Sequence, residues 1–196
     1  MLQYYSNREL SDKLGVNLAK WKRWSREFLP PDPLGGMQSG FARQYHPDEA
    51  FLVHLGGLLV ADMKYSIPEA RQILADLDEW LLNNGFFYDP PGNEKQMEGV
   101  ENQVERHMIY ICCSTDTERK RYDFHYIIKG IIRKKTVTHD GFSVLEEKYV
   151  ERTVGLRANS NKRVDMIGMR VMNITGVLER FLENLGRDKA SYRALS

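Results

Sequence analysis

Cysteine is nearly missing from this chain of 196 residues, which holds only two, adjacent at Cys112 and Cys113. A disulfide between adjacent cysteines does not link distant segments of a chain, so a disulfide framework is not expected. Zinc-type spacings such as CxxC and HxxxH are missing as well. The run from His107 to Cys113 is apolar, which favours cysteine acting as a small hydrophobe. We therefore expect no metal site and no cofactor.

Long apolar runs are also missing, since no stretch approaches the roughly 20 residues that cross a bilayer. The first residues lack the charged-then-apolar layout of a signal peptide. These absences predict a cytoplasmic protein with no membrane partner. The chain further lacks the catalytic motifs GxxxxGK[ST], GxGxxG after a strand, HExxH and GxSxG, and its five histidines are scattered. We expect it not to be an enzyme.

The formal net charge of +1 hides an uneven distribution. Residues 1–45 hold seven Lys or Arg against four Asp or Glu, and residues 107–196 hold seventeen against eleven. Residues 46–106 hold four against twelve, which is typical of a solvated acidic surface. The basic first segment suits contact with DNA, because its cations coincide with helix spacing.

Two short helices are predicted in that basic segment. Ser6 and Glu9 have the spacing of a capping box, and Gly15 suits the end of the helix that they begin. Asn17 is a good N-cap for a second helix running to about Phe28. Two helices joined by such a turn form a helix-turn-helix, whose second helix enters the major groove of DNA.

The second helix has an apolar side and a basic side. Leu18, Trp21 and Trp24 recur every three residues and are expected to face inward. Prolines at 30, 31 and 33 stop the helix, and residues 34–40 have the composition of a turn that reverses a short β-ribbon, or wing. The residues predicted to contact DNA from this helix and wing are Asn17, Lys20, Lys22, Arg23, Arg26, Arg43 and Tyr45.

Several short motifs occur in this region: Gly15-Val16-Asn17, Lys20-Trp21-Lys22, Trp24, and Gly40 with Arg43 and Tyr45. Together they resemble the mercury-resistance regulator (MerR) class of winged-helix proteins, over about residues 1–86. The resemblance implies a second helix on double-stranded DNA and a wing on the backbone. The chain departs from the family at Asn17 and Lys20, where the family has serine and threonine, and at Lys22, where it has arginine. The wing also has one extra residue, so the family's promoter preference is not carried over.

Two more helices complete the expected DNA-binding domain. Pro47 suits the first turn of a helix whose apolar face holds Phe51, Leu52, Leu55, Leu58 and Leu59. Ser66 and Glu69 form a second capping-box pattern, and the helix that follows has one apolar side made by Ala70, Ile73, Leu74, Leu77 and Leu81.

The second half begins with a predicted linker at residues 87–106. Strands are expected at residues 107–113, 122–137 and 142–154, with Asp140-Gly141 making a tight hairpin turn. For the last segment we favour a strand to about Asn173 and a helix from near Thr175 to Leu185; one continuous helix is the alternative. Basic clusters at residues 119–121 and 133–135 fit a half-exposed sheet better than nucleic-acid contact.

The sequence thus predicts an α+β protein in two parts. Residues 1–86 form a mainly α winged helix-turn-helix domain, and residues 107–196 form an antiparallel β meander with a terminal helix. The second part serves dimerisation or ligand sensing, or is a structural partner, and a small-molecule effector stays an open alternative. The expected function is a homodimeric, sequence-specific transcriptional regulator. Alternatives are an architectural or accessory phage or plasmid DNA-binding protein, such as an excision or packaging factor, and a protein-interaction module.

Overall fold

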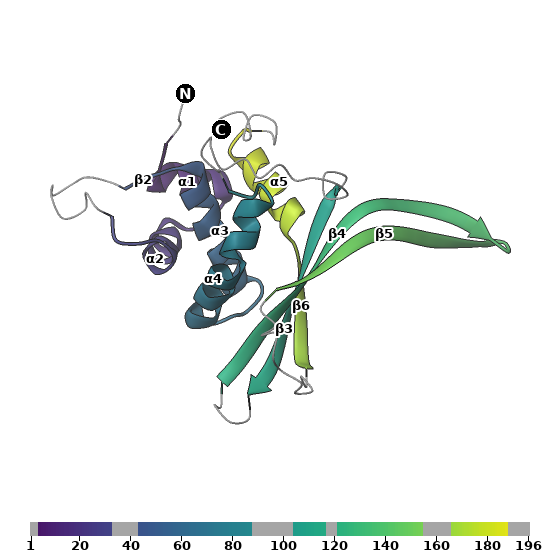
Figure 1. The fold of residues 1–196 in the computed structure, drawn as a ribbon. Helices are drawn as coiled ribbons and strands as arrows, with labels where there is room; N and C mark the ends of the chain where they lie inside the picture. The colour runs from purple at the N-terminus through teal and green to yellow at the C-terminus, as the bar shows by residue number, and fades with distance from the viewer. Residues whose placement is uncertain (1–3, 33–42, 88–103, 117–120, 155–165, 188–196) are drawn as a thin grey trace. The chain divides into compact units, whose positions relative to one another are not determined.

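A computed structural model describes residues 4–32, 43–87, 104–116, 121–154 and 166–187 of the chain. The protein is α+β, as expected (Figure 1). Its residues group into two compact units. The helical unit comprises Met1–Glu94 and Val177–Ser196, and the sheet unit comprises Lys95–Gly176. No helix in the described part is both long and apolar enough to span a membrane.

The helical unit is built from four helices of the first half, the larger part of a fifth, and one small two-stranded sheet. In that sheet β1 and β2 pair antiparallel, with Tyr5 opposite Tyr45. The elements are β1 (Tyr5–Ser6), α1 (Asn7–Leu14), α2 (Leu18–Phe28), β2 (Gln44–Tyr45), α3 (Pro47–Ala61), α4 (Ile67–Asn83) and α5 (Ile174–Asn184).

The helix boundaries follow the capping signals. Ser6 and Ser66 each close a capping box with a glutamate three residues later, which confirms the predicted starts of α1 and α4. Every residue of the predicted apolar side of α4 is buried. The apolar face predicted for α3 is only partly correct, because Leu52 and Leu58 are half-buried, whereas Val53, Gly56 and Gly57 are buried although they were not predicted. A helix packed on several sides lacks a clean polar face.

The sheet unit contains four antiparallel strands in the order β5-β4-β3-β6. The expected meander holds for β3, β4 and β5, but β6 returns to pair with β3 rather than with β5. This is the order of a Greek key, and it is possible because eleven residues separate β5 from β6. The strands are β3 (Arg106–Asp116), β4 (Arg121–His139), β5 (Phe142–Val154) and β6 (Met166–Asn173).

Two local predictions in this half are confirmed. Asp140 and Gly141 both have positive φ, 48° and 83°, between the paired residues His139 and Phe142, which is the geometry of a tight hairpin turn. The final segment is a strand followed by a helix, and a continuous helix is wrong. Asn173 ends the strand, and its side chain accepts a hydrogen bond from the backbone N–H of Gly176 in the first turn of α5.

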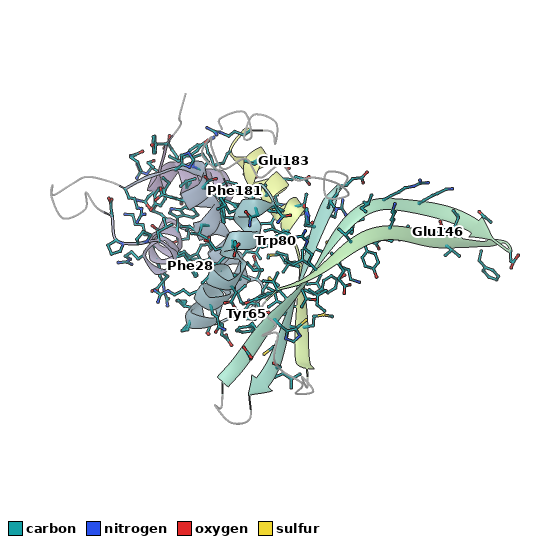
Figure 2. The ribbon with its side chains drawn as sticks, in the orientation of Figure 1. Phe28, Tyr65, Trp80, Glu146, Phe181 and Glu183 are labelled. Atoms are coloured by element: carbon teal, nitrogen blue, oxygen red, sulfur yellow. The ribbon has the colours of Figure 1, made fainter. Side chains whose placement is uncertain are left out.

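The structure divides the chain differently from the expected domains. The boundary between the units falls within the first turn of α5, and residues from Val177 onward group with the helical unit rather than with the sheet. The reason is aromatic packing, since the centroid of the Phe181 ring, labelled in Figure 2, lies 5.2 Å from that of the Phe51 ring of α3. Most of the predicted linker and the predicted turn of the wing lie outside the described residues.

Candidate nucleic-acid interface

The turn between α1 and α2 is fixed by local hydrogen bonds. Gly15 ends α1 with a φ of 63°, a conformation that favours glycine. The Ser11 hydroxyl donates to the carbonyl of Val16 at 2.6 Å. The Asn17 side chain accepts from the N–H groups of Ala19 and Lys20 at 2.9 and 3.3 Å, which starts α2. The two helices are therefore joined by three residues in a defined geometry.

The inner face of α2 packs tightly against α3. Trp21 is fully buried and Trp24 is 7% exposed, as the spacing predicts. The rings of Trp24 and Phe28 lie against Gly57 and Gly56, so closely that a Cβ on either glycine would overlap a ring. This glycine pair was not recognised in the sequence, although two glycines inside a helix are costly and signal close packing.

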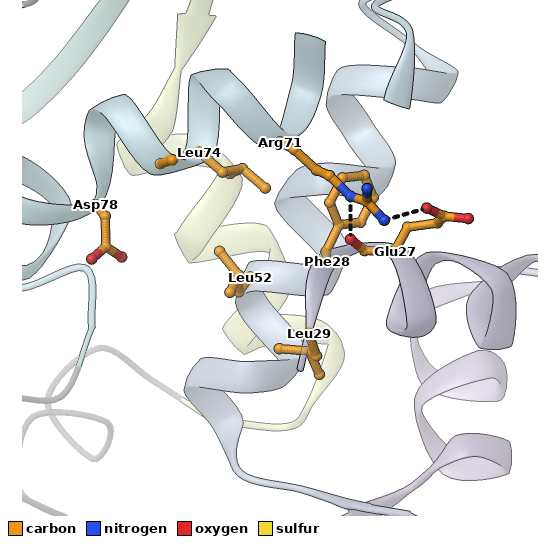
Figure 3. Close-up of a pocket in the computed structure, with 8 residues that line it drawn as sticks. Glu27, Phe28, Leu29, Leu52, Arg71, Leu74 and Asp78 are labelled. Carbon is orange, nitrogen blue, oxygen red and sulfur yellow. Dashed lines mark hydrogen bonds and ion pairs between the residues drawn. The ribbon is translucent and has the colours of Figure 1, made fainter. Parts of the chain in front are cut away.

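Residue Arg71 of α4 fixes the far end of α2. Its Nε donates to the backbone carbonyl of Glu27 at 2.7 Å, and its Nη2 lies 2.6 Å from the Glu27 carboxylate (Figure 3). The carbonyl belongs to the last turn of α2, where cations are favoured. Arg71 therefore positions α2, and its guanidinium is engaged by these two contacts with Glu27.

The outer face of α2 is basic and open. Lys22, Arg23 and Arg26 are all exposed. At 100° per residue they lie on the side opposite Trp21 and Trp24, so they form one surface rather than a scatter of charges. We call Lys22, Arg23 and Arg26 the α2 basic face.

Two predicted contact residues lie at the start of α2. Asn17 and Lys20 are exposed, but the Asn17 side-chain oxygen is engaged in capping the helix. Lys20 lies at the edge of the exposed surface, with its ammonium 5.1 Å from the centre of the Trp24 ring. A cation over an aromatic face keeps its charge available to solvent on the other side.

Arg43 and Tyr45 are not placed as predicted, because both face the protein. The Arg43 guanidinium donates to the carbonyl of Pro30 at 2.8 Å and to the Glu49 carboxylate at 3.1 Å. Tyr45 is 1% exposed, and burial raises the pKa of its hydroxyl. These side chains tie the segment before α3 to the helix pair, so we remove them from the contact set.

The Tyr45 hydroxyl joins α1 to α2. It donates to the side-chain oxygen of Asn7 at 2.7 Å and lies 2.7 Å from the Ser25 hydroxyl. Its ring meets Trp21 edge to face, with centroids 5.8 Å apart. No pattern in the sequence distinguishes buried Tyr45 from exposed Tyr4, because the burial of Tyr45 depends on segments that are distant in sequence, such as β1, with which β2 pairs.

A groove of about 480 Å³ lies between the end of α2 and helices α3 and α4 (Figure 3). Its walls are mostly apolar, and of its polar side chains Arg71 and Glu27 are already paired with each other. A small-molecule site usually has several converging polar groups, which this groove does not offer. We assign it no ligand.

The two cysteines lie on β3, with Cys112 fully buried and Cys113 partly so. Burial raises the pKa of the Cys112 thiol, which disfavours the thiolate that binds metals. Within the described ranges, no three His, Cys, Asp or Glu side chains gather in a way that would hold a metal ion.

Comparison with known proteins gives this chain no relative. No family model, curated protein or solved structure matches it. Among the described residues, the α2 basic face is the surface that offers the most specific chemistry.

Proposed function

We propose that this protein is a sequence-specific transcriptional regulator, a winged helix-turn-helix protein of MerR-like type whose α2 enters the major groove of DNA. The observation that carries the proposal is the α2 basic face. Its three cations project from a helix whose opposite side is fixed by buried tryptophans. A rigid helix with one cationic side fits the width and the negative charge of the major groove.

The cations of this face suit different parts of DNA. By helix geometry Arg23 and Arg26 lie nearest the middle of the exposed side, and Lys22 lies toward its flank. An arginine fork matches the O6 and N7 acceptors of guanine, whereas a lysine is a point charge suited to phosphate. We therefore assign base contacts to Arg23 and Arg26, and phosphate contact to Lys22 and to Lys20 at the edge of the surface.

The proposal includes a homodimer on a pseudo-palindromic site. One recognition helix covers only a few base pairs, and two related by a two-fold axis read two half-sites about one helical turn apart. Asn17 contributes by fixing where α2 begins, since its side-chain oxygen caps that helix. The wing part of the proposal rests on the resemblance, because its turn lies outside the described residues.

Selection of bound sequences from a random duplex pool tests the proposal directly. A regulator of this kind enriches one motif with two half-sites related by symmetry. Arrays of adjacent protected sites without a common motif would favour an architectural or accessory DNA-binding protein instead. Failure to enrich any sequence at low salt would refute both and leave a protein-interaction role.

A pair of matched variants tests the surface. Replacing Lys22 and Arg23 by glutamine removes two exposed cations from the α2 basic face while keeping good helix formers. We expect weaker duplex binding and a salt dependence reduced by about two units of slope. The control replaces Lys64 and Arg180, two exposed cations elsewhere in the helical unit, by glutamine. Equal affinities for the two variants would contradict the proposed interface.

A further inference from the structure

The strands β4 and β5 extend beyond the sheet as a two-stranded ribbon. β3 pairs with β4 up to Ile131, and beyond that point residues 133–148 have β4–β5 pairing alone among the described strands. The register shifts between Ile131 and Arg133, and an irregularity of this kind bends a strand. Figure 1 shows the ribbon curving away from β3 and β6. We call residues 133–148 the arm.

The arm exposes large apolar side chains. Phe142 is 74% exposed, Leu145 59% and Val144 44%, and no charged residue lies between them in sequence. A two-stranded hairpin by itself is at best marginally stable in water, because neither face is covered. The arm thus carries an apolar tip that gains stability only from contact with another surface.

A second apolar surface lies on β6, at the opposite edge of the same sheet. Met169 and Val171 lie two residues apart on this strand and point to one side, and Ile167 lies next to them at an irregularity in the pairing with β3. Ile167, Met169 and Val171 are 57%, 49% and 46% exposed. Phe142 and Val144 likewise share one face of β5, whereas Leu145 lies on its other face. The two surfaces therefore match in chemistry.

The two edges of the sheet differ in charge. β5 carries Glu146, Glu147, Lys148, Glu151 and Arg152, whereas β6 carries only Arg170. Charged side chains are a common means of preventing an edge strand from associating with another chain. The β6 edge lacks this protection, which favours association there.

The arm of one copy cannot cover its own β6 without breaking the ribbon. Two strands separate β5 from β6, and the arm begins beyond Arg106, whereas Val171 and Met169 pair with Tyr110 and Cys112 farther along β3. The eight residues from Ile131 to the hairpin turn carry the tip roughly 26 Å past the sheet. The described residues of one chain therefore leave both apolar surfaces exposed.

We propose that a second copy of this chain covers them. The arm of each protomer lies across the β6 face of its partner, so that Phe142 and Val144 of one copy cover Met169 and Val171 of the other. Reciprocal contacts of this kind close a two-fold dimer and leave neither surface exposed. The association needs no DNA, so its failure and the failure of the proposed function are distinguishable.

The arm carries charges of both signs, since residues 133–148 hold four Lys or Arg and three Asp or Glu, and this small net charge gives DNA little attraction. Lys135 lies opposite Glu146, whose side chain projects from the ribbon in Figure 2, and Glu147 occupies the next position. Acidic side chains along a two-stranded arm repel phosphates and offset its cations. A contact made by the apolar tip does not meet this repulsion.

Sedimentation equilibrium of the full chain without DNA tests the dimer. The arm variant combines Phe142→Glu with Val144→Glu, and the sheet variant combines Ile167→Glu with Met169→Glu. Each is expected to weaken self-association by roughly tenfold or more, as loss of central apolar contacts does. Leu82→Glu changes another exposed apolar residue, on α4, and serves as the control that should associate like the unmodified chain. A milder pair, Phe142→Ser and Met169→Thr, is used if a glutamate variant fails to fold.

Mixing the two variants distinguishes this arrangement from other dimers. In an equimolar mixture the intact arm of the sheet variant meets the intact β6 of the arm variant, so one of the two contacts is restored and mixed dimers should form. Arm-to-arm or edge-to-edge dimers would not be rescued in this way. The proposal is overturned by a monomeric unmodified chain, by dimers that both variants leave intact, or by a mixture without rescue. It is also overturned if the arm variant stays dimeric and loses only its affinity for duplex DNA.

Discussion

Replacing Gly57 by alanine should show how closely α2 is held against α3. The added Cβ would lie 2.7 Å from Cδ2 of Trp24, and closer still to two other carbons of the same ring. Ordinary contacts between such carbons are about 3.5–4.0 Å. Because Trp24 is only 7% exposed, its ring has little room to withdraw, and α2 has to shift with it.

Two opposing effects set the size of the change. Overpacking a buried site costs about 1–3 kcal/mol, and alanine gains about 1 kcal/mol over glycine from its better helix propensity. We expect the helical unit to lose about 1–2 kcal/mol of its free energy of unfolding, since the overlap exceeds what a side-chain rotation relieves. Gly56→Ala should behave similarly, because its Cβ would lie 2.5 Å from the ring of Phe28.

Urea unfolding followed by tryptophan fluorescence measures this effect in the right part of the chain. All three tryptophans, Trp21, Trp24 and Trp80, lie in the helical unit, so the signal reports its unfolding and not that of the sheet. A double-mutant cycle with Trp24→Leu isolates the contact, because the smaller side chain makes room for the new methyl group.

Two results would refute the argument. The first is a Gly57→Ala variant as stable as the unmodified chain or more so, which would mean that helix propensity outweighs the overlap. The second is additivity with Trp24→Leu, which would show that the cost arises away from the ring.

Three further predictions concern single side chains. Burial lowers the pKa of His54 to about 4 from the ordinary 6.5, so the folded unit binds fewer protons than the unfolded chain between these values. The contribution of His54 to the free energy of unfolding is therefore complete above pH 6.5 and falls, by at most about 3 kcal/mol, as the pH drops toward 4. The pH dependence of stability of His54→Phe should lack this fall. Tyr45→Phe removes the partner of Ser25 and Asn7 and should cost about 1–3 kcal/mol in urea unfolding, whereas Tyr4→Phe, on a ring 53% exposed, should cost nothing measurable. Arg71→Met should change stability by less than about 1 kcal/mol, because its ion pair with Glu27 is largely exposed; a larger loss in thermal unfolding would mean that its bond to the α2 carbonyl dominates.

Local chemistry in the sequence was enough to place most elements. Ser6, Gly15 and Asn17 bound α1 and the start of α2, and Asp140-Gly141 sets the β4–β5 turn. These signals act over three or four residues, through hydrogen bonds and backbone preferences that a linear pattern reveals. The change from strand to helix after Asn173 was predicted for the same reason.

Contacts between distant segments were not predictable in this way. A pattern of apolar residues shows that a strand or helix buries one side, but not which partner it buries that side against. β6 pairs with β3 rather than β5, and Phe181 of α5 packs with Phe51 of the helical unit. The predicted meander and the predicted boundary of the second domain both differ from the structure for this reason.

The residues predicted to contact DNA divide in the same way, into those whose position follows from local helix geometry and those whose position depends on distant contacts. The α2 basic face was predictable from the sequence alone, because helix periodicity places Lys22, Arg23 and Arg26 opposite the tryptophans. The orientation of Arg43 and Tyr45 depends on contacts with distant segments, because the Glu49 carboxylate binds Arg43 and β1–β2 pairing places Tyr45 against the helices. A side chain's solvent exposure depends on neighbours far away in sequence, whereas its position around a helix depends only on the rise and twist of that helix.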